Sequence, residues 1–138
     1  MGTLTGSGRD ALAKAVYAAL TGNANLMTLI TGVYDHVPES TDFPYVGLGD
    51  ITENEAGVFD HDYWDCTVTI HAWSNVRGDR ELNAILKQIN LALDRVTLSL
   101  ADGSIPYIKY TTANVLPEPG PGVTTRHLVA RYRAVVAA

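Results

Sequence analysis

The sequence predicts an α+β fold, a mainly antiparallel β-sheet with two principal α-helices packed on one face. The segment Tyr63–Ser74 alternates apolar and mixed residues, as a strand covered on one side requires. The next segment, residues 79–95, repeats apolar side chains at helical spacing and so carries one apolar stripe. The elements follow as helix, strands, helix, strands, without the repeated strand–helix–strand order of a parallel sheet.

The N-terminal part supplies the first helix and the first long strand. Residues 9–20 carry one apolar stripe and predict a helix. Residues 25–30 predict a short helical turn, and residues 33–37 predict a brief extended segment. Residues 43–55 predict a strand, with Pro44 at a first position that need not donate to a neighbouring strand.

An acidic connection joins the two longest predicted strands. Residues 54–61 contain Gly57 and several acid or amide groups, which favours an exposed turn. The strands on either side, residues 44–55 and 62–74, are therefore expected to form an antiparallel hairpin with an acidic tip. The remaining segments are, in order, residues 96–100, a turn at 101–103, an extended run at 105–116, a Pro/Gly-rich loop at 117–122 and a last alternating strand at 125–136.

Length and composition favour one hydrophobic core. The chain has 138 residues, of which 46% are hydrophobic, so residues 9–138 are expected to form a single domain after a flexible arm at residues 1–8. That arm has no hydrophobic signal region, and no apolar run is long enough to cross a bilayer. Cys66 is the only cysteine, which excludes an intrachain disulfide, and its place on the apolar side of a strand predicts a buried structural thiol.

The net charge of −5 conceals a segregation of acidic and basic residues. No Lys or Arg occurs from Ala15 to Val76, whereas most of the acidic residues lie there. Binding of nucleic acid relies on Lys and Arg to neutralise phosphates, so this composition excludes a DNA-gripping module. Two interpretations remain, a solvated acidic surface or one that faces a partner or a passage for a sliding polyanion. The acidic residues of this span are Asp35, Glu39, Asp42, Asp50, Glu53, Glu55, Asp60, Asp62 and Asp65.

The histidines are the candidates for catalysis or metal binding, and none stands at a ligand spacing. His71 and His127 can meet across neighbouring strands with Asp65, either as a polar surface contact or as the site of a small metal-dependent hydrolase. No nucleophile elbow, phosphate-binding loop or dinucleotide fingerprint occurs in the sequence. We therefore expect a protein without enzymatic activity, catalytic residues, bound metal or cofactor.

Surface residues of two kinds predict contacts with other chains. Tyr63 and Trp73 lie on the side of their strand opposite the apolar set, and exposed aromatic residues favour a protein contact. Arg126, Arg131 and Arg133 form the one concentrated basic patch of the sequence. Acidic and basic regions on one chain suit a head-to-tail contact, which closes into a ring when the rotation fits. These five residues are the expected subunit interface.

Five short motifs stand in a characteristic order, namely Tyr-Asp-His-Val-Pro at 34–38, Phe-Pro-Tyr-Val at 43–46, Thr-Ile-His-Ala-Trp-Ser at 69–74, Thr-Arg-His at 125–127 and Arg-Tyr-Arg-Ala at 131–134. In this order and spacing they resemble the tail-completion proteins of tailed phages. These proteins are also called tail terminators or head-to-tail joining proteins, and relatives occur in prophages and gene transfer agents. The resemblance runs from about Leu12 to the C-terminus, and the loop at residues 117–122 departs from it.

The resemblance implies a structural virion protein that assembles into a ring, expected to be a hexamer. Such a ring caps the tail tube, joins it to the head or neck connector protein, and lets DNA pass through its centre without specific binding. It resides in the tail or neck of the virion after assembly in the bacterial host cytoplasm, with no membrane partner. A non-viral adaptor remains an alternative, beside the hydrolase. The residues expected to face the lumen or an axial partner are Glu53, Glu55, Asp60, His61 and Asp62.

Overall fold

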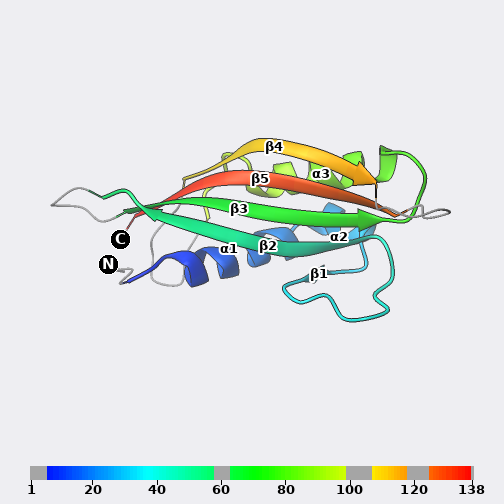
Figure 1. The fold of residues 1–138 in the computed structure, drawn as a ribbon, viewed down its shortest axis with the longest axis horizontal. Helices are drawn as coiled ribbons and strands as arrows, with labels where there is room; N and C mark the ends of the chain where they lie inside the picture. The colour runs from blue at the N-terminus through cyan, green and yellow to red at the C-terminus, as the bar shows by residue number, and fades with distance from the viewer. Residues whose placement is uncertain (1–5, 58–62, 99–106, 118–124, 138) are drawn as a thin grey trace.

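The computed structural model describes residues 6–57, 63–98, 107–117 and 125–137 of the chain. Within them a five-stranded sheet forms one layer and three helices lie together on one of its sides (Figure 1). The predicted α+β class is therefore confirmed. The elements are α1 (Arg9–Thr21), α2 (Ala24–Leu29), β1 (Val33–Tyr34), β2 (Tyr45–Glu55), β3 (Tyr63–Ser74), α3 (Arg80–Leu93), β4 (Tyr107–Pro117) and β5 (Arg126–Ala137).

The sheet has the strand order β1-β2-β3-β5-β4, with β3 at its centre. β3 pairs antiparallel with β2 on one side and with β5 on the other, so the predicted β2–β3 hairpin is confirmed. β1 pairs in parallel with β2 over two positions, and β4 pairs antiparallel with β5. Parallel pairing of β1 was not foreseen, because a two-residue strand leaves no alternation in the sequence.

Some predicted boundaries move by one or two residues. Pro117 was expected in a loop but ends β4, opposite Arg126. Proline fits there because an outer strand has one edge that donates to no neighbour. Residues 96–98 have no regular structure. The expected turn at residues 101–103 lies outside the described residues, as does most of the expected loop after Pro117.

One face of the sheet and the apolar stripes of the helices form the core. In β3 the even-numbered residues from Trp64 to Ser74 are buried, and the odd-numbered ones are half-buried on the other face. Burial raises the pKa of the Cys66 thiol to about 11, which confirms the buried structural cysteine. Tyr132 is fully buried and donates its hydroxyl proton to Asn90 of α3. The helices contribute Leu12, Val16, Leu20, Leu26, Leu82, Ile85, Ile89 and Leu93 to this core.

The start of α1 is bonded to β2. The Ser7 hydroxyl and the Gly8 amide both donate to the Glu53 carboxylate, at 3.0 and 2.8 Å. The Arg9 side chain donates from Nε to the Ile51 carbonyl at 2.9 Å. Ser7 and Gly8 were expected in a flexible arm, but these bonds hold them against the sheet, while residues 1–5 lie outside the described part. None of the helices in the described ranges is long and apolar enough to span a bilayer.

Truncation of a core residue of α3 should destabilise the chain far more than truncation on its outer side. Ile85 is fully buried, whereas Leu91 of the same helix is 62% exposed. Ile85→Ala should lower the free energy of unfolding by about 2–5 kcal/mol, and Leu91→Ala by less than about 0.5 kcal/mol. Chemical denaturation of the two variants measures both effects, and equal losses would contradict this assignment of the core.

Candidate interaction surface

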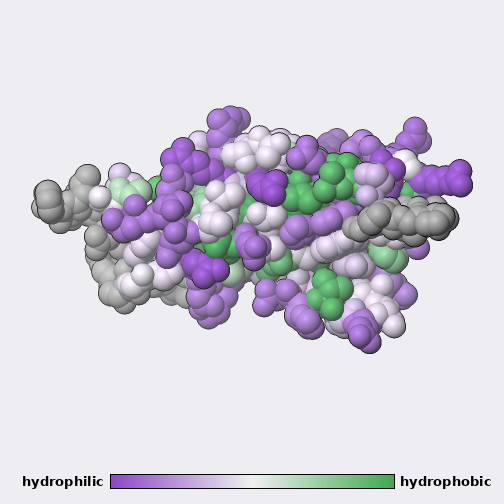
Figure 2. All heavy atoms as spheres, viewed as in Figure 1, coloured by the Kyte–Doolittle hydropathy of each residue, from purple (hydrophilic) through white to green (hydrophobic). Residues whose placement is uncertain are grey.

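The sheet face turned away from the helices is the surface on which most of the sequence-predicted site residues lie. We call it the open face. Figure 2 views it from the sheet side, where hydrophobic residues form separate patches among hydrophilic ones. From β3 and β5 it receives Tyr63, Asp65, Thr67, Thr69, His71, Trp73, His127, Val129, Arg131, Arg133 and Val135.

Four rings from three strands stack on the open face. We call them the ring stack: Tyr45 of β2, His71 and Trp73 of β3, and His127 of β5. The Trp73 ring lies between Tyr45, at a centroid distance of 5.1 Å, and His127, at 4.6 Å with an interplanar angle of 10°. The His71 ring also stacks on Trp73, at 5.4 Å. Stacked aromatic pairs stabilise beyond their buried area, so the stack orders this part of the surface.

Two glycines of β2 make room for the ring stack. A Cβ at Gly47 would lie 2.9 Å from a ring carbon of Trp73, and a Cβ at Gly49 would lie 2.6 Å from Nε2 of His71. Both distances are too short for carbon atoms, so only glycine lets the rings lie over β2. Sequence reasoning missed this role, although two glycines inside a strand pattern were a signal of close approach.

His71 and His127 meet as expected. Nδ1 of His71 lies 2.6 Å from Nε2 of His127, which is a hydrogen bond when one nitrogen carries a proton and the other does not. Burial lowers the pKa of His71, and the nearby His127 and Arg131 lower it further, while Asp50 opposes them. The surroundings therefore favour the neutral form of the His71 ring.

Asp65 does not join the two histidines. It lies six residues before His71 on β3, which places it about 20 Å away along the strand. Its carboxylate accepts two hydrogen bonds from Arg133, at 2.9 Å from Nε and 2.8 Å from an outer nitrogen. The Arg133 guanidinium holds the pKa of Asp65 below its usual value. The predicted convergence of Asp65 with His71 and His127 is wrong, and the described residues contain no cluster of three potential metal ligands.

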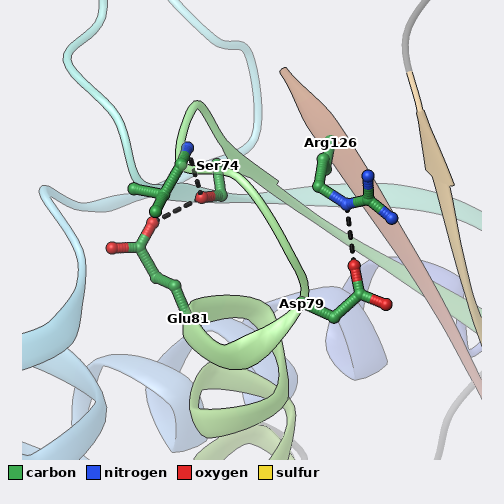
Figure 3. Close-up of polar contacts among 5 residues, drawn as sticks. Ser74, Asp79, Glu81 and Arg126 are labelled. Carbon is green, nitrogen blue, oxygen red and sulfur yellow. Dashed lines mark hydrogen bonds and ion pairs between the residues drawn. The ribbon is translucent and has the colours of Figure 1, made fainter. Parts of the chain in front are cut away.

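The three arginines expected to form one patch are divided between two faces. Arg131 is exposed and Arg133 is exposed beside Asp65, both on the open face. Arg126 is paired with Ser74, whose side chain is buried, and therefore turns toward the helices. Its Nε donates to the Asp79 carboxylate at 2.7 Å (Figure 3). The prediction failed because residues an odd number apart on a strand point to opposite faces.

The contacts around Arg126 fix the connection from β3 to α3. The Ser74 hydroxyl donates to the Glu81 carboxylate at 2.5 Å and accepts from the Val76 amide at 3.2 Å (Figure 3). Together with the Arg126–Asp79 ion pair, these bonds tie the first turn of α3 to the ends of β3 and β5.

The acidic residues of the hairpin are described only in part. The Glu53 carboxylate is occupied by Ser7 and Gly8, as above, and Glu55 accepts a hydrogen bond from the Gly57 amide at 2.5 Å. Asp60, His61 and Asp62 lie outside the described residues. Tyr63 begins β3 on the open face and is half-buried. The ring stack and the predicted acidic tip are therefore at opposite ends of the sheet.

Comparison with known proteins identifies the family. The family model described as "Tail completion protein gp17" matches residues 14–137. The chain belongs to the tail completion protein gp17 family. The resemblance noted from the sequence is thereby confirmed, and membership makes the chain a structural protein of a phage tail. No match was found among curated protein sequences.

Two solved structures share the fold of this chain. A chain from the virion of a native gene transfer agent particle superposes with a TM-score of 0.85 at 23% identity, over 97% of this chain and 100% of that one. The gp17 protein of bacteriophage SPP1 superposes with a TM-score of 0.61 at 19% identity, over 100% of this chain and 96% of that one. These likenesses extend over nearly the whole chain and confirm its architecture.

The lowered pKa of His71 should make the chain less stable in mild acid. A histidine whose pKa is depressed in the folded state stabilises the fold above its ordinary pKa of about 6.5, and this contribution is lost as the pH falls through the depressed value. Denaturant titrations at pH 7 and pH 5 should show this loss in the natural chain and a smaller one in His71→Gln. The control variant His36→Gln, at an exposed position, should lose as much free energy of unfolding between pH 7 and pH 5 as the natural chain. If His71→Gln also loses as much as the natural chain, His71 is not the source of the pH dependence.

Proposed function

We propose that the chain assembles into a hexameric ring that caps the tail tube and joins it to the head or neck connector protein. The observation that carries the proposal is the family match, which spans residues 14–137 and so includes every described strand and helix apart from the first five residues of α1. The ring belongs to the tail or neck of the virion and assembles in the host cytoplasm, with residues 9–138 as its single folded unit. No enzymatic step is part of this function.

The acidic hairpin is proposed to face the lumen or an axial partner. Its residues are Glu53, Glu55, Asp60, His61 and Asp62, within a span that has acidic residues and no Lys or Arg. Like charges repel the phosphates of DNA, so a lumen of this composition lets DNA slide without specific binding. The charge on the described part of the hairpin supports this proposal, since Glu55 is exposed at the end of β2.

The open face is proposed to contribute to the subunit interface. Arg131 and Arg133 supply positive charge there, and Tyr63 and Trp73 supply aromatic surface. Interfaces are enriched in aromatic residues and arginine, which favours this set over the other exposed positions of the sheet. Arg126 is left out of this contact surface, because its side chain turns toward the helices, where it bonds to Asp79.

The capping function is tested by polymerising the tail-tube protein of the same virion, with and without the chain, and measuring tube lengths by negative-stain electron microscopy. The chain should shorten the tubes and appear as a ring at one tube end. Arg131→Glu should lose this effect because it reverses charge at the proposed interface, whereas Lys87→Glu, on the outer side of α3, should retain it. Tubes of unchanged length with bare ends would contradict the proposal.

A further inference from the structure

The outer edge of β4 is closed over its first half. The Arg95 amide donates to the Ile108 carbonyl at 2.8 Å, and the Tyr110 amide donates to the Asp94 carboxylate at 2.8 Å. Ile108 and Tyr110 therefore turn their backbone groups away from β5, and the segment after α3 bonds one group of each residue, the Ile108 carbonyl and the Tyr110 amide. Covering an edge in this way prevents another chain from pairing with it.

The second half of β4 is not closed. A bulge at Thr111 shifts the register, so that Ala113 and Val115 now stand opposite Ala130 and Leu128 of β5 and turn their backbone groups outward. No hydrogen bond from a described residue reaches these outward groups. Among the described parts of the chain, two amides and two carbonyls of this edge are thus left for another strand to bond.

The opposite edge of the sheet has a matching gap. β1 covers β2 only at Val46 and Gly47. Further along β2, Arg9 occupies the outward carbonyl of Ile51, as described above, and the next residues that turn outward by alternation are Glu53 and Glu55. Their backbone amides and carbonyls have no hydrogen-bond partner among the described residues.

The two edges carry opposite charge. The edge strand β4 carries Lys109, its neighbour β5 carries the exposed Arg131, and neither strand contains an acidic residue. The other two arginines of β5, Arg126 and Arg133, are already paired with Asp79 and Asp65. β1 and β2 contain Asp50, Glu53 and Glu55 and no basic residue. Opposite charges on two edges of one sheet favour contact between unlike edges of two copies and disfavour contact between like edges.

We propose that β4 of one copy pairs antiparallel with β2 of the next copy, with Asn114 opposite Asn54. The inference rests on the proposed ring and adds the two sheet edges to the open-face residues as contacts between its subunits. β4 and β2 run in opposite directions within one sheet, so copies that point the same way around a ring bring them together antiparallel. In this register Ala113 stands opposite Glu55 and Val115 opposite Glu53, so all four outward-turned residues exchange hydrogen bonds.

The same register is consistent with a closed assembly. Within one sheet Asn54 stands opposite Asp65, whereas Asn114 stands opposite Val129 and, beyond it, His71. Within one copy, the open segment of β4 is therefore displaced from the open segment of β2 by about 20 Å along the strand direction. Across the sheet, β2 of one copy lies four strand spacings from β2 of the next, or roughly 19 Å. Each copy must therefore be shifted along the strand direction by about that displacement relative to the copy before it. This shift tilts the strands by about 45° from the axis of the ring, near the tilt of strands in closed β-barrels. β1 blocks the pairing without stagger, because it covers that part of β2.

Disulfide cross-linking of the full-length chain tests this register. Asn54 and Asn114 are both exposed and both on the open face, and directly opposite residues of this kind bring their Cα atoms within about 5 Å, as a disulfide requires. In a Cys66→Ala background, the variant Asn54→Cys/Asn114→Cys should form a ladder of cross-linked species on oxidation, ending at the ring. Either cysteine alone should give no species larger than a dimer.

The matched control is Asn54→Cys/Lys109→Cys, whose second cysteine is exposed on the same strand and face but roughly 16 Å out of register. A ladder from the first pair and none from the control supports the proposal. An equal ladder from both pairs, or none from the first, overturns it. If the uncross-linked chain still forms rings in that case, the edge pairing fails while the proposed ring stands, whereas a chain that remains monomeric under every condition fails both.

Discussion

β3 is hydrogen-bonded to a neighbour along both of its edges and covered by helices on one of its faces, and this double constraint determines the rest of the structure. Because its even-numbered side chains are buried, a shift of one residue would expose the whole set, so the registers of β2 and β5 are fixed relative to it. The apolar stripe of α3 then packs on the face of the sheet that carries these buried side chains. The contacts of Ser74 with Glu81 and of Arg126 with Asp79 hold the first turn of α3 in place. The open face is what remains.

The open face offers the kind of surface that a structural role requires. The ring stack can form because glycines at positions 47 and 49 leave room for the rings over β2. Its two histidines are bonded to each other, and Asp65 is bonded to Arg133, so the three polar groups that suggested catalysis do not converge. What distinguishes the molecule is the charge on its edges and the aromatic surface between them, which are properties of a protein that contacts other chains.

The sequence predicted the parts that depend on local periodicity. The alternation of Tyr63–Ser74 and the stripe of α3 gave the central strand, the main helix and the buried Cys66. Features that depend on strand order were not predictable in the same way. The ring stack needs β2, β3 and β5 side by side, and the bulge at Thr111 reverses which residues of β4 face outward. The grouping of Arg126 with Arg131 and Arg133 failed because closeness in sequence was mistaken for a shared face.

The central claim is that this chain acts through its surfaces, by joining copies of itself end to end around a closed ring. Native mass spectrometry of the full-length chain over a range of protein and salt concentrations tests it most directly. The account predicts one closed species of fixed subunit number, which loses subunits as salt screens the oppositely charged edges. A monomer at every concentration, or an open-ended series of sizes that salt leaves unchanged, would contradict it.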